Sequence, residues 1–454
     1  MKKYDVIIVG SGPAGISAAI ELSQAPDIKV LLLDKGKDIE HRVCPGLKGD
    51  DGCRRCSPCN LVSGWGGAGA FSDGKLTLSS EVGGRLKEYI GVEKTEELIK
   101  YVDCSYSKFG RSDRLYGVGD KVEEIRERAT LADLRLIPMV VRHMGTEHAR
   151  VVLCRMRDFV SKKVEIRLNI TVKSLITEGG TIAGVQTEDG ERFECKYLIV
   201  APGREGSDWL AHEAQRLKLT LEINPIDVGV RVEVPEAVLK DITDVMYECK
   251  LEYYSQSFDD RVRTFCMCPA GEVTMETTGG ADPVTTVNGH SYAERKTNNT
   301  NFAILVSTTF TEPFRDPIAY GRYLARLGDL LEGRRSTRAR IERGNVVPTL
   351  KSAVPGDLSF ALPYRHLKDV IEMLQALDKL APGIASRHTL LYGIEVKFYS
   401  SRLLLSDSLE SEIANMFAVG DGVGVSRGLV QASASGVVAA REVLRRVGAS
   451  VQAP

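Results

Sequence analysis

The sequence lacks features that would place it outside the ordinary globular proteins. No apolar run approaches the roughly 20 residues that cross a bilayer, and the N-terminal residues show neither the apolar core nor the cleavage site of a signal peptide. Lysine and arginine number 60 against 61 aspartate and glutamate residues, so the formal net charge is −1. We therefore expect a cytoplasmic protein that binds neither a membrane nor, through a chain-wide basic surface, nucleic acid.

Disorder-promoting composition and internal repeats are absent as well. Hydrophobic residues make up 43% and charged residues 27% of the 454 positions, which are ordinary values for globular proteins. A chain of this length is expected to fold into about two or three domains. Residues 211–385 contain no second Gly-rich dinucleotide motif between a strand and a helix, so we expect no nicotinamide-binding domain there.

Glycine is abundant, and its first cluster follows a short apolar run. Residues 4–9 (YDVIIV) are typical of a buried parallel strand, and the motif GSGPAG over residues 10–15 follows directly. A helical stretch, a second strand over 28–33 and Asp34 complete a dinucleotide-binding pattern. The turn lets a diphosphate approach the helix N-terminus, and Asp34 is placed to accept hydrogen bonds from ribose. The predicted contacts are Gly10, Gly12, Pro13, Ala14, Gly15, Asp34 and Lys35.

Two further segments indicate which dinucleotide binds. A predicted strand over 415–419 leads into Gly420-Asp421-Gly422 and a helix rich in small residues, while residues 197–204 (YLIVAPGR) form a strand and a turn. Both segments resemble FAD-binding motifs of the glutathione-reductase superfamily of flavoproteins. The resemblance implies FAD, with Asp421 at the ribityl–phosphate region and the positive end of the helix at the flavin pyrimidine. The residues concerned are Ala201, Gly203, Gly420, Asp421, Gly428 and Leu429.

Four other segments are similar to a largely uncharacterised group of FAD-dependent dehydrogenases. They are residues 64–76 (GWGGAGAFSDGKL), 228–233 (VGVRVE), 265–271 (FCMCPAG) and 348–350 (PTL). The similarity extends over nearly the whole chain and implies a fold and a cofactor but little about the substrate. It also implies that the Gly-rich loop packs near the flavin ring. The loop residues concerned are Gly66, Gly67 and Ala68, which leave room for the ring, and Ser72 and Lys75, which can reach its polar edge.

These motifs predict an α/β fold with a Rossmann-type, glutathione-reductase-like FAD-binding domain. Strand-like segments at 164–168, 170–176, 182–188 and 192–200, separated by turn residues, predict a β-meander that leads into the closing strand of that domain. The middle of the chain mixes predicted strands and helices and is expected to form an inserted α+β cap that binds substrate. The expected boundaries are 1–210 for the first part of the FAD domain, 211–385 for the cap and 386–454 for the C-terminal part of the FAD domain.

Four of the ten cysteines are clustered. Cys44, Cys53, Cys56 and Cys59 follow a C-P-x7-C-x2-C-x2-C pattern that ends five residues before Gly64. This spacing lets thiolates converge on one metal centre and is similar to that of bacterial ferredoxins, which favours a [4Fe–4S] cluster close to the flavin. Structural zinc and unmetallated or regulatory thiols are the alternatives.

Two pairs of residues are candidates for catalysis, together with Lys75. Cys266 and Cys268 lie one residue apart in a predicted strand, so both thiols are expected on the same side, either in the core or in the substrate cavity. Glu395 and Lys397 alternate in the same way, either on a solvated face or lining the flavin cavity.

The sequence as a whole predicts an FAD-dependent oxidoreductase that reduces or oxidises a small organic substrate, such as an activated double bond. Electrons are expected to arrive through the cluster from a ferredoxin-like donor, and seven arginines between Arg322 and Arg343 can dock an acidic partner. The alternatives are transient binding of NAD(P)H, a redox adaptor between protein partners, and a flavoprotein that modifies RNA. The substrate and the oligomeric state do not follow from the sequence.

Overall fold

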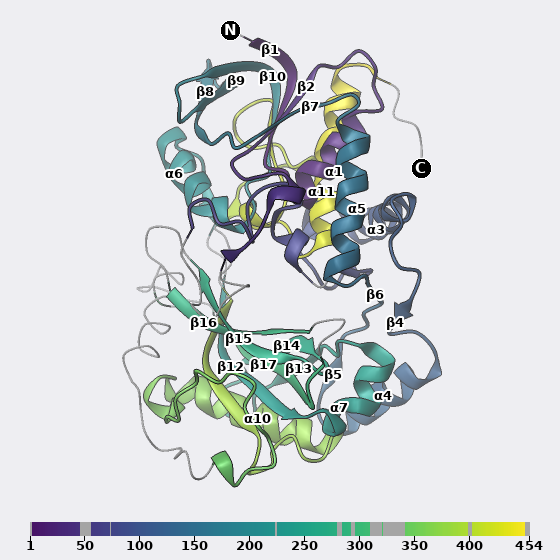
Figure 1. The fold of residues 1–454 in the computed structure, drawn as a ribbon, viewed down its shortest axis with the longest axis vertical. Helices are drawn as coiled ribbons and strands as arrows, with labels where there is room; N and C mark the ends of the chain where they lie inside the picture. The colour runs from purple at the N-terminus through teal and green to yellow at the C-terminus, as the bar shows by residue number, and fades with distance from the viewer. Residues whose placement is uncertain are drawn as a thin grey trace. The chain divides into compact units, whose positions relative to one another are not determined.

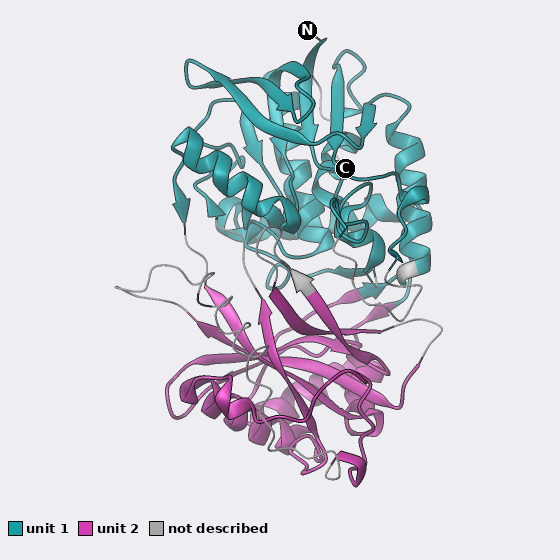
Figure 2. Cartoon of the chain, turned by 60° about the vertical axis from the view of Figure 1, so that its left-hand side comes forward, with its two compact units in different colours: residues 1–114, 142–222, 400–454 teal, residues 115–141, 223–399 magenta. Residues whose placement is uncertain are grey.

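The computed structural model describes residues 2–45, 56–72, 74–222, 225–278, 284–291, 296–308, 320, 341–397 and 402–449. The chain divides into two compact units, which Figure 2 colours separately. Unit 1 contains Met1–Arg114, Arg142–Glu222 and Ser400–Pro454, and unit 2 contains Leu115–Val141 and Ile223–Tyr399.

Unit 1 is built on a sheet with the strand order β7-β2-β1-β10-β9-β8, in which β20 also pairs with β10 (Figure 1). Residues 6–9 of β1 and all of β2 are buried because helices and neighbouring strands surround a parallel sheet. The strands are β1 (Lys2–Val9), β2 (Val30–Asp34), β7 (Glu165–Leu168), β8 (Val172–Glu178), β9 (Thr181–Thr187), β10 (Arg192–Val200) and β20 (Met416–Ala418).

The meander was predicted with one strand too many. Strand β7 pairs in parallel with β2, so residues 164–168 extend the parallel sheet, and only β8, β9 and β10 form the antiparallel run. Strand β10 then closes the sheet by pairing in parallel with both β1 and β20, as expected for the closing strand.

Helix α1 begins at Pro13, a residue whose fixed φ and missing N–H suit the first position of a helix. It lies alongside α11, where a Cβ on Gly436 would come within 2.0 Å of the Ala14 carbonyl oxygen. The small residues of α11 are therefore required by the close packing of these two helices (Figure 1). Unit 1 also contains α2 (Leu86–Ile90), α3 (Val92–Lys108), α5 (Thr146–Val160), α6 (Ser207–Leu217), β3 (Lys75–Thr77), β11 (Leu221–Glu222) and β19 (Arg402–Leu403), besides α1 (Pro13–Leu22) and α11 (Leu429–Arg446).

Unit 2 is an antiparallel sheet with the order β18-β12-β17-β14-β13-β5. One face carries an apolar core beneath α7 (Glu236–Met246) and α10 (Tyr364–Leu380), and the hairpin of β15 (Glu272–Thr278) and β16 (Val284–His290) packs against the same sheet. The sheet strands are β5 (Arg135–Leu136), β12 (Ile226–Pro235), β13 (Leu251–Tyr254), β14 (Arg261–Cys268), β17 (Asn299–Thr308) and β18 (Leu390–Lys397). Unit 2 also contains β4 (Leu115–Tyr116) and α4 (Asp120–Leu131), and β6 (Val141–His143) begins in unit 2 and ends in unit 1.

The boundaries of the two units differ from those of the predicted domains. Residues 115–141 and β18 belong to unit 2, and β18 does so because it pairs with β12. A predicted helix over 319–331 and most of the arginine-rich stretch lie outside the described residues.

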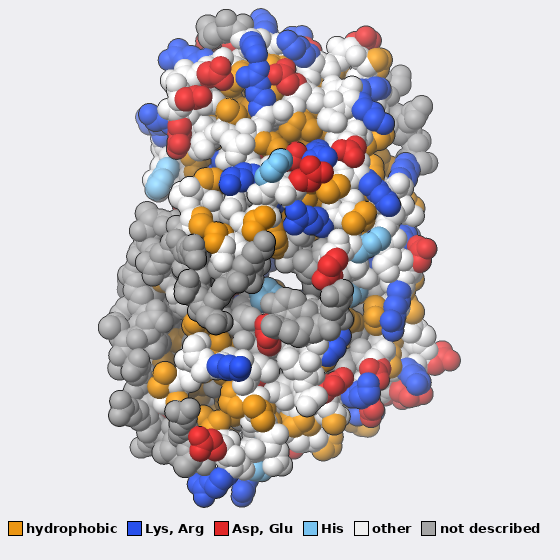
Figure 3. Space-filling view, in the orientation of Figure 1, with side chains coloured by type: hydrophobic (Ala, Val, Ile, Leu, Met, Phe, Trp, Pro, Cys, Tyr) orange, Lys and Arg blue, Asp and Glu red, His pale blue; other side chains and the backbone are white. Residues whose placement is uncertain are grey.

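Charges of both signs are interspersed over the face drawn in Figure 3. Among the helices that the structure describes, none combines the length and the apolar character needed to span a bilayer.

Candidate functional site

The glycines of the turn after β1 differ in the space around them. Two of them pack tightly against neighbouring backbone, and the third does not. Gly10 has φ +104°, and a Cβ there would lie 2.0 Å from the Ala201 carbonyl oxygen. A Cβ on Gly15 would lie 1.9 Å from the Gly10 carbonyl oxygen, whereas one on Gly12 would meet nothing closer than the Gly67 Cα at 4.0 Å. Two glycines thus hold the strand–turn–helix unit together, and Gly12 leaves backbone open for a ligand.

Two helices of unit 1 begin without the side-chain caps that usually satisfy their first N–H groups. Gly12 caps α1 and Gly428 caps α11, neither helix has a side-chain cap hydrogen bond, and neither has an acidic residue in its first turn. Free N–H groups and the positive end of the helix dipole favour an anion at both places. Together with the open Gly12 backbone, they fit the diphosphate and the electron-rich ring edge of FAD.

Asp34 is already saturated by donors of its own chain. One carboxylate oxygen accepts from the Ser11 N–H at 2.7 Å and the Ser11 hydroxyl at 2.8 Å. The other accepts from the Gly36 N–H at 2.8 Å and the Gly64 N–H at 2.9 Å. A carboxylate has about four acceptor positions, so Asp34 joins three loops, and its contact with ribose stays a prediction. The neighbouring Lys35 forms an ion pair with Glu205 at 3.3 Å.

Arg42 fixes the second Gly-rich loop and was not found from the sequence. Its side chain is fully buried, and it donates to the carbonyl oxygens of Asn60 at 2.9 Å, Leu61 at 2.8 Å and Trp65 at 2.7 Å. Burial lowers the pKa of Arg42 to about 10, with Asp34 acting in the opposite direction. An isolated arginine carries no sequence signal for this role, because its partners are backbone atoms 18 to 23 positions away.

The loop that Arg42 holds lies against the dinucleotide turn. The Gly66 N–H donates to the Ser11 carbonyl oxygen at 2.8 Å, and a Cβ on Gly67 would lie 3.0 Å from the Gly12 Cα. Ala68 is exposed, and the Ser72 hydroxyl donates to the Gly69 carbonyl oxygen at 2.9 Å. Gly66 and Gly67 therefore lie beside the turn predicted to bind the dinucleotide, Ala68 and Ser72 follow in the same loop, and Lys75 lies on β3.

The C-terminal motif also lies at this end of the sheet. β20 pairs with the end of β10, and Gly420 and Asp421 follow it after one residue, Val419. The Ser426 hydroxyl donates to Asp421 at 2.7 Å, and burial raises the pKa of Asp421. A Cβ on Gly203 would meet nothing within 4 Å, so the turn after Ala201 is open as well. Leu429 begins α11.

Three of the four clustered cysteines lie in the described part of the chain. Cys44 and Cys59 are half-buried, Cys56 is exposed, and burial raises the pKa of the Cys59 thiol. Cys53 lies outside the described residues. Within the described part of the chain, no three His, Cys, Asp or Glu side chains gather as metal ligands. The three described thiols thus do not fit a [4Fe–4S] cluster or zinc as they stand, and we derive no step through a metal.

Four of the five catalytic candidates come together in unit 2, around Arg231 of β12. The Arg231 guanidinium is 3.3 Å from the Cys268 sulfur and 3.5 Å from Glu395, which in turn lies 3.0 Å from the Lys397 ammonium. Burial lowers the pKa of Arg231, but Glu395 and the two nearby cysteines more than offset this and raise it. The sequence placed Arg231 in a strand without a role, because its partners come from other strands. Lys75 belongs to unit 1.

The alternation predicted for the two cysteines of β14 is interrupted. Cys266 has φ +45°, and the register between β14 and β17 shifts between Phe265 and Cys268. Cys266 presents its carbonyl oxygen to Arg231 at 2.6 Å, whereas Cys268 presents its sulfur. A bulge re-aims side chains that strict alternation would place together, so the sequence rule did not apply here.

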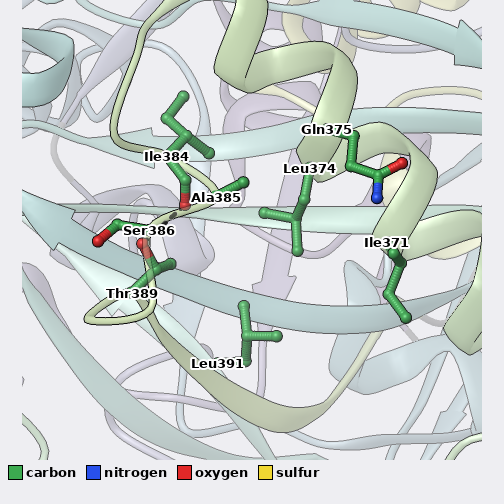
Figure 4. Close-up of a pocket in the computed structure, with 8 residues that line it drawn as sticks. All are labelled: Ile371, Leu374, Gln375, Ile384, Ala385, Ser386, Thr389 and Leu391. Atoms are coloured by element: carbon green, nitrogen blue, oxygen red, sulfur yellow. Dashed lines mark hydrogen bonds between the residues drawn. The ribbon is translucent and has the colours of Figure 1, made fainter.

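A separate surface groove in unit 2 has a volume of about 250 Å³ and contains none of the candidates (Figure 4). It lies between α10, the loop that follows it and β18, and its lining is mostly apolar. The residues are Ile371, Leu374, Gln375, Ile384, Ala385, Ser386, Thr389 and Leu391.

Family models match three parts of the chain. Residues 225–326 match "FAD-dependent protein, C-terminal domain-like", residues 1–46 match the Thi4 family, and residues 340–450 match "Glucose inhibited division protein A".

Similar proteins include an uncharacterized protein of Clostridium beijerinckii and a thioredoxin reductase of Bacillus subtilis. The first is 24% identical over 97% of this chain and 80% of its own length, and the second is 26% identical over 51% of this chain and 83% of its own length. Among solved structures, L-proline dehydrogenase from P. horikoshii is 13% identical with a TM-score of 0.43, covering 99% of this chain and 95% of that chain. Glycine oxidase from Geobacillus kaustophilus is 14% identical with a TM-score of 0.37, covering 98% and 95%. The matched family models and the open dinucleotide turn of unit 1 support the activity of an FAD-dependent oxidoreductase.

Proposed function

We propose that the chain transfers reducing equivalents between FAD bound in unit 1 and a small organic substrate, such as a molecule with an activated double bond. The observation that carries this proposal is the open backbone at Gly12, next to a helix start that has neither a cap nor an acidic residue. FAD, when bound, supplies hydride or single-electron chemistry, and the protein supplies orientation and electrostatics.

Different residues of unit 1 bind different parts of FAD. The turn from Gly10 to Gly15 and the first N–H groups of α1 bind the diphosphate, and Asp421 accepts hydrogen bonds from the ribityl chain. The N-terminus of α11 offsets negative charge at the pyrimidine edge of the ring. Asp34 and Arg42 hold the two Gly-rich loops in place, which makes them positioning residues.

Reduction of the flavin in the purified protein tests this function. We expect a visible flavin spectrum that bleaches with a reductant under anaerobic conditions and returns on addition of an electron-accepting substrate. Activated alkenes are the first class to test. A flavin that exchanges electrons only with a protein such as ferredoxin would favour a redox adaptor.

We keep ligation of a [4Fe–4S] cluster by Cys44, Cys53, Cys56 and Cys59 as a separate proposal, supported by the spacing of the four thiols. Cys44 is among the groups that, after burial, raise the pKa of Cys59, but no third described ligand joins this pair, and Cys53 lies outside the described residues. Anaerobic preparation should give about four iron and four sulfide per chain, lost in Cys56→Ala and retained in Cys104→Ala, an exposed thiol outside the loop. One zinc without iron would favour a structural metal, and free alkylation of all four thiols would remove the site.

A ferredoxin-like donor that docks on the stretch from Arg322 to Arg343 is also a proposal, supported by its seven arginines. Reversing Arg334 and Arg335 to glutamate should slow reduction by such a donor, most strongly at low salt, because screening is weakest there. A reduction rate that is unchanged and independent of salt would contradict it.

A further inference from the structure

Strand β12 has one apolar face and one charged face, and both are buried. Its valines point into the core of unit 2, while the alternate residues Asp227, Arg231 and Glu233 are 1%, 0% and 0% exposed. Taking each charge out of water costs several kcal/mol unless partners compensate. The partners of these three residues therefore show what the charged face requires.

Two of the three charges are satisfied within the chain. Asp227 pairs with Arg263 and accepts from the Ser307 hydroxyl at 2.8 Å. Glu233 accepts from the Tyr392 hydroxyl at 2.5 Å, the Thr349 hydroxyl at 2.6 Å and the Asn299 amide at 3.0 Å. These carboxylates have donors enough to be structural.

Around Arg231, one acceptor atom and one donor atom have no hydrogen-bond partner among the described residues. Glu395 uses a single carboxylate oxygen for both Arg231 and Lys397, and within the described residues its Oε2 has no donor. Asn301 accepts twice from Arg231 through its Oδ1, at 2.8 and 2.7 Å, whereas its Nδ2 finds no acceptor in the described parts of the chain. Both side chains are 0% exposed, so water does not compensate freely.

The charges at this point do not balance either. The cationic Arg231 and Lys397 share one buried carboxylate, and the next acid, Glu276, is 3.9 Å from Lys397 and one-third exposed. Gly289 of β16 lies so close that a Cβ there would be 2.0 Å from the Arg231 guanidinium. Among the described residues the cluster thus has an excess positive charge, and the Gly289 backbone closes it on one side, so a ligand that joins it has to be small.

We propose that this cluster binds a small organic carboxylate that carries a hydroxyl or amino group on the adjacent carbon. The hydroxyl or amino group donates to the Glu395 Oε2, and the ligand carboxylate accepts from the Asn301 Nδ2 and offsets the excess positive charge. The inference rests on the proposed function in one respect, that the bound carboxylate is the substrate of the oxidoreductase. Binding itself is a property of unit 2.

Isothermal titration of the FAD-loaded chain tests the proposal, with glycolate and glycine as probes and acetate as the matched ligand that lacks the donor. Glycolate or glycine should bind at least about tenfold more tightly than acetate, because a hydrogen bond to a charged group contributes roughly 1.5–3 kcal/mol. Asn301→Asp keeps an oxygen for Arg231 but replaces the free donor with a negatively charged acceptor. It should weaken binding of the better probe by more than about tenfold while the FAD content stays unchanged.

Thr300→Val is the control variant. Thr300 precedes Asn301 on β17, is buried, and its hydroxyl has no hydrogen-bond partner among the described residues, but it is not part of the cluster. The isosteric change should leave probe binding within about twofold. Glu395→Gln is a second variant, expected to weaken binding because it removes the negative charge that receives the ligand donor.

The possible failures are distinguishable. The proposal is overturned if the FAD-loaded protein binds neither glycolate nor glycine, if acetate binds equally well, or if Asn301→Asp binds as the wild type does. Glycolate binding by a protein that takes up no FAD would instead contradict the proposed function and leave the site in unit 2 standing.

Discussion

Asp34 of unit 1 and Glu395 of unit 2 are both buried carboxylates, but their oxygens meet different surroundings. Asp34 accepts from three backbone N–H groups and one hydroxyl, so each oxygen has two donors. Glu395 shares one oxygen between two cations, and its other oxygen is unpaired within the described residues. A carboxylate saturated by its own chain acts as a clamp, whereas one with a spare oxygen has the capacity to bind a ligand.

The largest expected effect comes from breaking the clamp. Asp34→Ala leaves three backbone N–H groups near the turn without an acceptor, at roughly 1–3 kcal/mol each. We expect the free energy of unfolding to fall by about 4–6 kcal/mol and FAD to be lost, measured by urea denaturation and flavin absorbance. Asp27→Ala, on an exposed residue, is the control. Loss of FAD at unchanged stability would mean that Asp34 is a ribose ligand and not a clamp.

Arg42 is the buried cation that holds the same Gly-rich loop, and its variants test whether its hydrogen bonds stabilise the fold. Arg42→Met keeps much of the buried apolar volume but removes three hydrogen bonds to carbonyl oxygens, so we expect a loss of about 3 kcal/mol. Arg42→Lys, which keeps the charge but loses the planar fork, should be intermediate. If both variants unfold at the wild-type urea concentration, Arg42 does not hold the loop.

Local patterns predicted much of unit 1 but not its partners. The run YDVIIV, the glycine motif and Asp34 lie within one short segment, so their periodicity and spacing determine a strand, a turn and a helix. Strand β7 was assigned to the meander because a strand pattern does not state which neighbour it pairs with. The hydrogen bonds of Asp34 to Gly64 and of Arg42 to Trp65 join residues 20 or more positions apart, and no local pattern encodes them.

In unit 2 the sequence indicated the residues of the cluster but not its centre. Cys268, Glu395 and Lys397 were candidates by residue type, whereas Arg231 was one charged residue in an alternating strand. Alternation predicts that it faces away from the valines, and only the assembled sheet shows that this face is buried. The bulge at Cys266 could not be anticipated, because nothing in the sequence marks its positive φ.

Asp369 of α10 offers a third buried carboxylate for the comparison. Burial and the neighbouring Asp260 raise the pKa of Asp369 to about 6, from 3.8. The folded state holds this proton more tightly than the unfolded state. The stability that depends on the protonated Asp369 carboxyl is therefore fully present below about pH 4 and is lost as the pH rises to about 6. Asp369→Asn should therefore be more stable than the wild type by about 2–3 kcal/mol above pH 6, and the difference should vanish below pH 4.

Urea unfolding of both proteins between pH 3.5 and 8 measures that difference. A constant difference across this range would show that the Asp369 carboxyl does not titrate differently in the folded and unfolded states.

The smallest change in stability is expected for a variant of the Gly-rich turn that weakens FAD binding without disturbing the packing of the fold. Gly12→Ala places a Cβ in ordinary contact with the Gly67 Cα, 4.0 Å away, at an ordinary φ of −75°, so stability should change by less than about 0.5 kcal/mol while FAD binds more weakly. Gly15→Ala should instead destabilise the fold, because its Cβ would lie 1.9 Å from the Gly10 carbonyl oxygen. Equal stability of the two variants would contradict the division of roles between these glycines.

The amount of FAD held by unit 1 tests the central claim most directly. Flavin released by denaturing the purified chain, measured by absorbance against protein concentration, should correspond to one FAD per chain. Gly12→Val, with an unchanged circular dichroism spectrum, should release little or none. A wild-type protein that is folded, contains no flavin and takes up no added FAD would contradict the account.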